Sequence, residues 1–99
     1  MIVPNRHLAE IERLSSSEFS DMNSMVVFAV KLLKKTLMPG GFNIGTNIGK
    51  HAGAGIERHL HTHVVPRWVG DTNFMPMISN TKVIPQSLVQ LYTRLKENL

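Results

Sequence analysis

Three histidines, His59, His61 and His63, alternate in the run HLHTHVVPRW. Alternate residues of a β-strand point to the same face of a sheet, and the β-branched residues in and after the run favour a strand. In a strand, all three imidazoles would therefore emerge on one face, and Leu60 and Thr62 would face the other. One face with three groups that titrate near neutral pH indicates a site with a chemical role, although three surface histidines without a role remain an alternative.

A metal site is the main competing interpretation. Residues two apart on a strand are separated by about 6.6 Å, so the outer histidines would lie about 13 Å apart, whereas zinc holds its nitrogen ligands at about 2.0–2.1 Å. Two neighbouring histidines could share an ion, but all three could do so only if the strand bent sharply. The chain has no Cys, and the acidic residues nearby are few (Glu57 and Asp71). We therefore favour a catalytic row over a metal triad.

Length and composition exclude several classes of protein. Ninety-nine residues, 42% of them hydrophobic, predict one small globular domain. No apolar run is long enough to span a membrane, and the lack of Cys is compatible with the cytoplasm. The formal net charge of +4 suits an anionic small molecule and is too small and too dispersed to predict nucleic-acid binding.

The order of elements predicts an α+β fold. Ser15 and Glu18 form a capping box at the start of a long helix, whose apolar stripe runs from Phe19 to Leu37 and which ends at Pro39-Gly40-Gly41. Residues 42–49 and the histidine run follow as antiparallel strands, and residues 73–79 could add an edge strand. A last helix begins at Pro85. We thus expect an antiparallel sheet with one long helix and a C-terminal helix.

The strand expected at 42–49 has two different faces. Apolar residues and Thr46 alternate with a polar, open face made of Asn43, Asn47 and glycines. Six of the seven glycines lie between residues 40 and 55, and the turn before the histidines contains Gly53 and Gly55. Glycines let backbone N–H groups approach a phosphate closely, so the turn is either a phosphate-binding loop or an ordinary hairpin connection.

The histidine run matches the signature His-φ-His-φ-His-φ-φ, where φ is apolar, and departs from it only at Thr62. It is flanked by FNIGTNIGKHAGAGIERH and PRWVGDTNFMP. In these segments the chain resembles the histidine triad (HIT) family, and within it the prokaryotic diadenosine tetraphosphate phosphorylase- and hydrolase-like branch. The relatives carry an upstream segment that forms much of the nucleobase pocket. The resemblance thus implies one HIT-like domain, residues 1–99, that is incomplete at its N-terminus.

The resemblance also implies an activity and roles for named residues. His61 would be the nucleophile, His63 would contact phosphate oxygens and the leaving group, and His59 would support them. Asn47 matches a phosphate-binding position, and the turn with Gly53 and Gly55 would donate backbone N–H groups to the developing charge. The expected course is attack on an α-phosphate and transfer of the nucleotide from His61 to water or phosphate, with hydrolysis favoured. His7 and His51 are expected to be structural or surface residues.

Cofactors, partners and assembly complete the expectation. The substrate would be a nucleotide or a dinucleoside polyphosphate, no cofactor would be required, and Mg²⁺ could accompany a polyphosphate. A non-catalytic nucleotide-binding or interaction module that retains the triad is the alternative. Family members pair through the long helix, so we expect a homodimer with Met25, Val26 or Phe28 near the two-fold axis.

Overall fold

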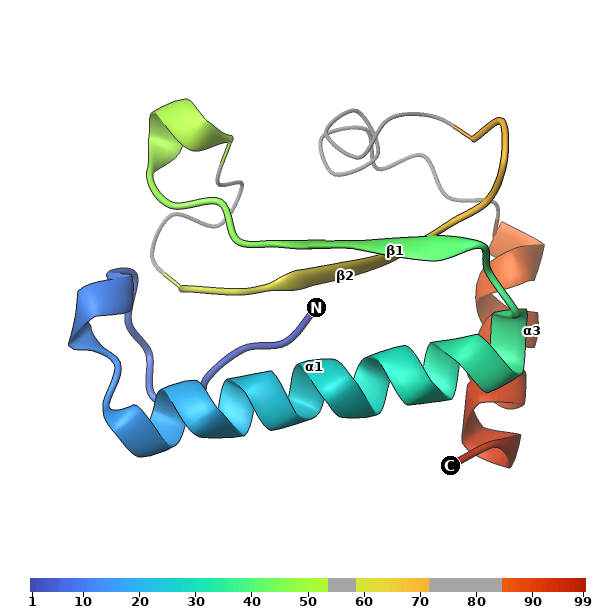
Figure 1. Ribbon diagram of the computed structural model, residues 1–99, viewed down its shortest axis with the longest axis horizontal. Coiled ribbons are helices and arrows are strands. Elements are labelled where there is room, and N and C mark those ends of the chain that lie inside the picture. The colour runs from blue at the N-terminus through green and yellow to red at the C-terminus, as the bar shows by residue number, and fades with distance from the viewer. Residues whose placement is uncertain (54–58, 72–84) are drawn as a thin grey trace.

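A computed structural model of the chain describes residues 1–53, 59–71 and 85–99, which form a mixed α+β structure. A 22-residue helix, α1 (Ser16–Leu37), lies along one side of an antiparallel hairpin of β1 (Gly41–Gly45) and β2 (His63–Arg67) (Figure 1). The N-terminal segment runs between them, and α3 (Pro85–Glu97) crosses the C-terminal end of α1 (Figure 1). Two short 3₁₀ turns, η1 (Ile11–Arg13) and η2 (Lys50–Ala52), precede α1 and follow β1. The edge strand expected at 73–79 lies outside the described residues.

The predicted capping box starts α1. The Ser15 hydroxyl accepts from the Glu18 N–H at 3.1 Å, and the Glu18 carboxylate accepts from the Ser15 N–H at 2.9 Å. The helix ends slightly earlier than Pro39 because Met38 adopts a left-handed conformation (φ 47°) and donates its N–H to the Lys34 carbonyl. This single 5→1 bond satisfies one of the last carbonyls of the helix.

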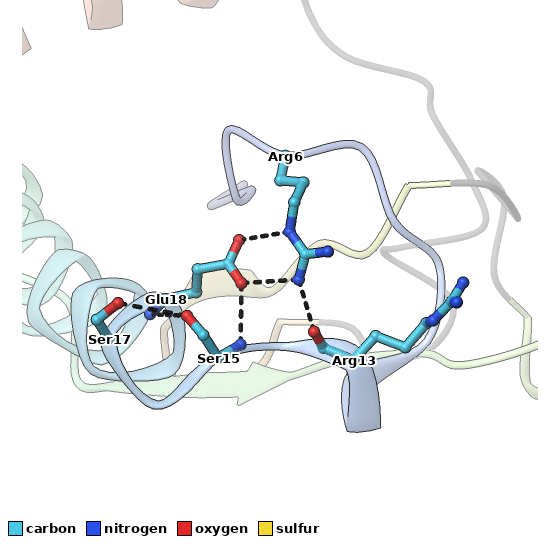
Figure 2. Close-up of polar contacts among 5 residues, drawn as sticks. All are labelled: Arg6, Arg13, Ser15, Ser17 and Glu18. Carbon is cyan, nitrogen blue, oxygen red and sulfur yellow. Dashed lines mark hydrogen bonds and ion pairs between the residues drawn. The ribbon is translucent and has the colours of Figure 1, made fainter.

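Arg6 ties the N-terminal segment to the start of α1 (Figure 2). Its guanidinium donates to both carboxylate oxygens of Glu18, at 3.1 and 2.9 Å, and also to the Arg13 carbonyl at 2.6 Å. The bonds from Arg6 to Glu18, and next the one from the Ser15 N–H, lower the pKa of Glu18 to about 2. Because Glu18 is shared between Arg6 and Ser15, the capping box and the N-terminal segment form one hydrogen-bonded unit.

The register of the hairpin places the two polar faces on the same side, as the alternation predicts. Gly45 pairs with His63, Asn43 with Val65 and Gly41 with Arg67. Residues directly opposite each other share a face, so His63 and Asn43 lie on one side of the hairpin. The other side faces α1 across a cavity of about 200 Å³ that contacts Phe19, Met22 and Val26.

Both strands are shorter than the alternation alone predicts. β1 stops at Gly45 and not at Gly49, where the backbone turns (φ 82°) into η2. β2 begins at His63 because the preceding residues bond to the N-terminal segment. Thr62 forms a bridge with Ile2, and the Leu60 N–H donates to the Leu8 carbonyl at 2.6 Å. The histidine run is therefore split between two partners, β1 and the N-terminal segment.

A pair of threonines explains the departure from the apolar signature at Thr62. Its hydroxyl lies 2.8 Å from the hydroxyl of Thr46, and both residues line the cavity between α1 and the hairpin. The hydrogen bond satisfies two polar groups on a face that is otherwise apolar, which makes a hydroxyl tolerable there.

This pair yields a stability prediction. Thr46→Val alone should lower the free energy of unfolding by about 1–2 kcal/mol, because it leaves the Thr62 hydroxyl without its partner. The double variant Thr46→Val/Thr62→Val should recover most of the loss, since an apolar pair of the same shape leaves no unpaired group. Urea denaturation of the four proteins measures the coupling, and additive losses would contradict the pairing.

The described residues contain few fully buried side chains. Pro4, Leu8 and Leu60 are the buried apolar residues among them, and Thr36 and His61 are the buried polar ones. Arg94 of α3 donates to the Thr36 carbonyl near the end of α1, which joins the two helices. None of the helices in the described ranges combines the length and the apolar character needed to cross a membrane.

Candidate functional site

Two of the three histidines form a close pair at the start of β2. The imidazole rings of His61 and His63 have centroids 4.7 Å apart and an interplanar angle of 81°. The strand pairing places His63 opposite Gly45. His61 lies two residues earlier in the chain and is only 4% exposed. The alternation therefore brings these two imidazoles together on the polar face of the hairpin.

A backbone carbonyl determines which nitrogen of His61 can act. Its Nδ1 lies 3.0 Å from the carbonyl oxygen of His59. A carbonyl can only accept, so Nδ1 must carry the proton and donate it. In the neutral ring Nε2 then has a free lone pair, which is the state that a nucleophile needs.

His59 turns toward the N-terminal segment. Its Nε2 lies 3.1 Å from the Pro4 carbonyl, to which it must donate, and its ring packs edge-on against His7 with centroids 5.0 Å apart. His59 thus holds the N-terminal segment through its side chain and His61 through its backbone. The contact of His7 with His59 adds a fourth imidazole to this region. His7 is expected from the sequence only as a structural or surface residue, and no sequence pattern indicates this contact.

The environment of His63 favours its neutral form. Partial burial, followed by the positive charge that His61 can carry, lowers the pKa of His63 below its ordinary value of 6.5. Burial penalises the charged imidazolium, and a neighbouring imidazolium repels it. The pair therefore resists accepting two protons.

This shift predicts an acid-sensitive stability. Below pH 6.5 the unfolded chain binds a proton at His63 more readily than the folded chain does, so stability falls as the pH drops from 6.5 through the lower folded pKa. We expect His63→Gln to remove part of this acid dependence, whereas the exposed-site variant His51→Gln should retain it. Unfolding midpoints measured between pH 4.5 and 7.5, with NMR titration of the His63 ring, check the sign. A His63 ring that titrates above 6.5 would contradict it.

The glycine turn and Asn47 lie beside each other. The Asn47 amide donates to the Gly53 carbonyl at 3.4 Å, and the Gly53 N–H donates to the Lys50 carbonyl at 3.1 Å. Gly53 has φ 85°, a conformation that favours glycine. Asn47 and Gly53 are therefore engaged with the turn in this structure. Gly55, the other expected donor, lies outside the described residues.

At the far end of the same face, Arg67 of β2 is bonded both to β1 and to the segment that follows β2. It donates to both carboxylate oxygens of Asp71, at 2.8 and 2.6 Å, and to the side-chain oxygen of Asn43. The hydrogen bonds from Arg67, and next that from the Trp68 N–H, lower the pKa of Asp71 to about 2. Within the described ranges no three His, Asp or Glu side chains gather closely enough to hold a metal ion.

These features agree with comparisons to known proteins. A family model for the HIT domain matches residues 1–69, so the chain belongs to the HIT domain family. The chain is 44% identical over 88 residues to the AP-4-A phosphorylase of Mycobacterium tuberculosis, a match that covers 89% of the chain and 45% of the relative. It is 28% identical over 71 residues to the asymmetrical bis(5'-nucleosyl)-tetraphosphatase of Schizosaccharomyces pombe, covering 72% of the chain and 38% of that protein.

A solved structure supports the fold. A Hit-like protein from Bartonella henselae superposes with a TM-score of 0.78 at 18% identity, over 98% of this chain and 67% of that one. At this identity the likeness concerns the fold alone. The chain spans about half the length or less of the two curated relatives described above.

Proposed function

We propose that this chain cleaves a phosphoanhydride bond of a dinucleoside polyphosphate, or a P–N bond of a nucleotide, through a nucleotidyl-histidine intermediate. The observation that carries the proposal is the hydrogen bond between His61 Nδ1 and the His59 carbonyl. It presents the Nε2 lone pair of a neutral imidazole beside a second imidazole, His63. Membership of the HIT family and the names of the two curated relatives support a nucleotide polyphosphate as substrate.

In the proposed reaction His61 Nε2 attacks the α-phosphorus, the bond to the leaving group breaks, and its electron pair departs with the leaving oxygen or nitrogen. His63 contacts the phosphate oxygens and assists the departure, and His59 holds His61 in its tautomer. Asn47 and the turn with Gly53 and Gly55 bind the phosphate oxygens, which requires the turn to exchange its internal bonds for bonds to the substrate. A second nucleophile then releases the nucleotide from His61.

The second nucleophile decides between two enzyme types. We favour water, which makes the chain a hydrolase. The relative at 44% identity is named a phosphorylase, so inorganic phosphate is the second candidate. Neither choice requires a redox or organic cofactor, and Mg²⁺ would act as a partner of the polyphosphate.

Turnover of diadenosine tetraphosphate by the purified chain, with and without inorganic phosphate, tests the proposal. Hydrolysis yields AMP and ATP. Phosphorolysis consumes phosphate and yields ADP and ATP, because the AMP on His61 is transferred to phosphate. We expect activity to survive a chelator when Mg²⁺ is resupplied. If zinc alone restored activity, the result would favour a zinc site at the histidines over a metal-free catalytic row.

Binding without turnover is the alternative function. Because few side chains of the described residues are fully buried, a module that keeps the histidines and binds a nucleotide without turning it over is a second candidate. Calorimetry with AMP together with a turnover assay separates the two, because a binding module would bind AMP and leave the tetraphosphate intact over hours.

A homodimer is part of the proposal, as is a cytoplasmic location. Met25 and Phe28 are exposed on α1, next to the exposed Val27, whereas Val26 lines the cavity toward the hairpin. An exposed apolar patch on a long helix fits burial against a second copy.

The dimer predicts a mass in solution. Light scattering should give twice the 11.1 kDa chain mass. Phe28→Glu should yield monomers, and Val89→Glu on α3 should not.

A further inference from the structure

We infer that Asn43 is a specificity-determining residue, whose amide N–H binds an oxygen of the polyphosphate chain beyond the phosphate at the histidines. The inference rests on the proposed function and deepens it. It concerns the half of the polar face that the histidines leave unused, between His63 and Arg67.

The first argument is the direction of the face. In the proposed reaction His61 attacks and His63 contacts the leaving group, so the path from His61 to His63 leads toward the leaving portion of the substrate. Continued along the hairpin, this path reaches Gly45, opposite His63, and then Asn43. Asn43 is two residues from Gly45 along β1, or about 7 Å. That is a distance that the further phosphates of a polyphosphate can cover.

The second argument is the orientation of the amide. Arg67 donates to the side-chain oxygen of Asn43, so the Nδ2 group must point away from Arg67. Within the described part of the chain Nδ2 makes no hydrogen bond, and it is not a fully buried unsatisfied atom. Arg67 is itself held by two bonds to Asp71, which fixes the amide before any ligand arrives.

The third argument is space and charge. Gly41, next to Asn43 on the same face, has no heavy atom of the described residues within 4 Å of the position that a Cβ would occupy. The ion pair of Arg67 with Asp71 leaves their combined charge formally neutral. The feature offered to a ligand is therefore a fixed, uncharged donor beside a position that the described residues leave unfilled, and such a donor suits an anionic oxygen.

Binding of three ligands in the presence of Mg²⁺ tests the inference: AMP, adenosine 5′-tetraphosphate and diadenosine tetraphosphate, with the catalytically blocked His61→Ala background for the last. Asn43→Asp keeps the acceptor for Arg67 and replaces the donor with a negative oxygen. We expect it to weaken both tetraphosphates by about tenfold or more and AMP by less than twofold. Asn43→Ala should weaken the binding of both tetraphosphates more than that of AMP, as Asn43→Asp does. Asn23→Asp, which adds the same charge to an exposed site on α1, should change none of the three.

The outcomes are distinct. Equal weakening of AMP and the tetraphosphates, or no weakening, would overturn the role of Asn43 and leave the proposed function standing. Weakening of diadenosine tetraphosphate alone would overturn the assignment to phosphate, because the donor would then contact the second nucleoside. A parent chain that binds none of the ligands would overturn the proposed function itself, and this inference with it.

Discussion

Replacement of His61 by Ala should lower turnover of diadenosine tetraphosphate by at least about 10³-fold, because it removes the atom that forms the intermediate. His61 is the most buried of the three histidines, and its Nδ1 is committed to the His59 carbonyl, so Nε2 is the nitrogen left to attack. Rapid quenching of the parent chain followed by intact-mass measurement should show a nucleotide-sized gain that His61→Ala lacks.

His51→Ala is the matched control for this prediction. His51 is an exposed histidine in η2, so its removal should leave both turnover and the adduct unchanged. The ring of His61 fills a buried position, and a loss of activity could follow from unfolding. A circular dichroism melt must therefore accompany the assay. A His61→Ala variant that folds and retains full activity would exclude the nucleotidyl-His61 mechanism.

Replacement of Leu60 by Ala should lower the free energy of unfolding by about 2–5 kcal/mol, the range found when a buried Leu is truncated. Leu60 is 3% exposed, and it lines the cavity of about 200 Å³ between α1 and the hairpin. Truncation would enlarge a space that is already incompletely filled. Since the folded state of a small domain is only marginally stable, the loss is a large fraction of the total.

Leu88→Ala is the control for this loss. Leu88 lies on α3 and is 53% exposed, so the same truncation should change the midpoint of urea denaturation little. Leu60 also stands between His59 and His61 in the chain, and its N–H donates to the Leu8 carbonyl. We therefore expect the His61 and His63 ring signals in NMR spectra to broaden in Leu60→Ala. Equal destabilisation by both substitutions would contradict the position of Leu60 in the core.

Several features of the fold follow from local chemistry and could be predicted. The capping box of Ser15 and Glu18 needs only residues three apart, so it is legible in the sequence and present in the structure. The alternation of β1 and β2 likewise predicts which side chains share a face, and the register of Gly45 with His63 confirms it. The match of the histidine run to the HIT signature is confirmed by the family model.

Contacts between distant segments could not be read from the same patterns. The alternation predicts three equivalent imidazoles, but His59 bonds to Pro4 and packs against His7, and His61 and His63 pair with each other. The difference arises because the run pairs with the N-terminal segment in its first half and with β1 in its second. Strand pairing depends on which backbone lies alongside, and a sequence period of two carries no information about that neighbour.

The sequence by itself determined the family, the α+β order of elements and the common face of His61 and His63, because these depend on spacing along one chain segment. Only the tertiary structure decided the proton position on His61, the partner of Thr62 and the fixed amide of Asn43. Thr62 and Asn43 find their partners, the Thr46 hydroxyl and the Arg67 guanidinium, far along the chain, and the nearby His59 carbonyl meets His61 Nδ1 only in the folded backbone conformation. Hydrogen bonds act over about 3 Å, so they are decided where the folded chain brings donor and acceptor together.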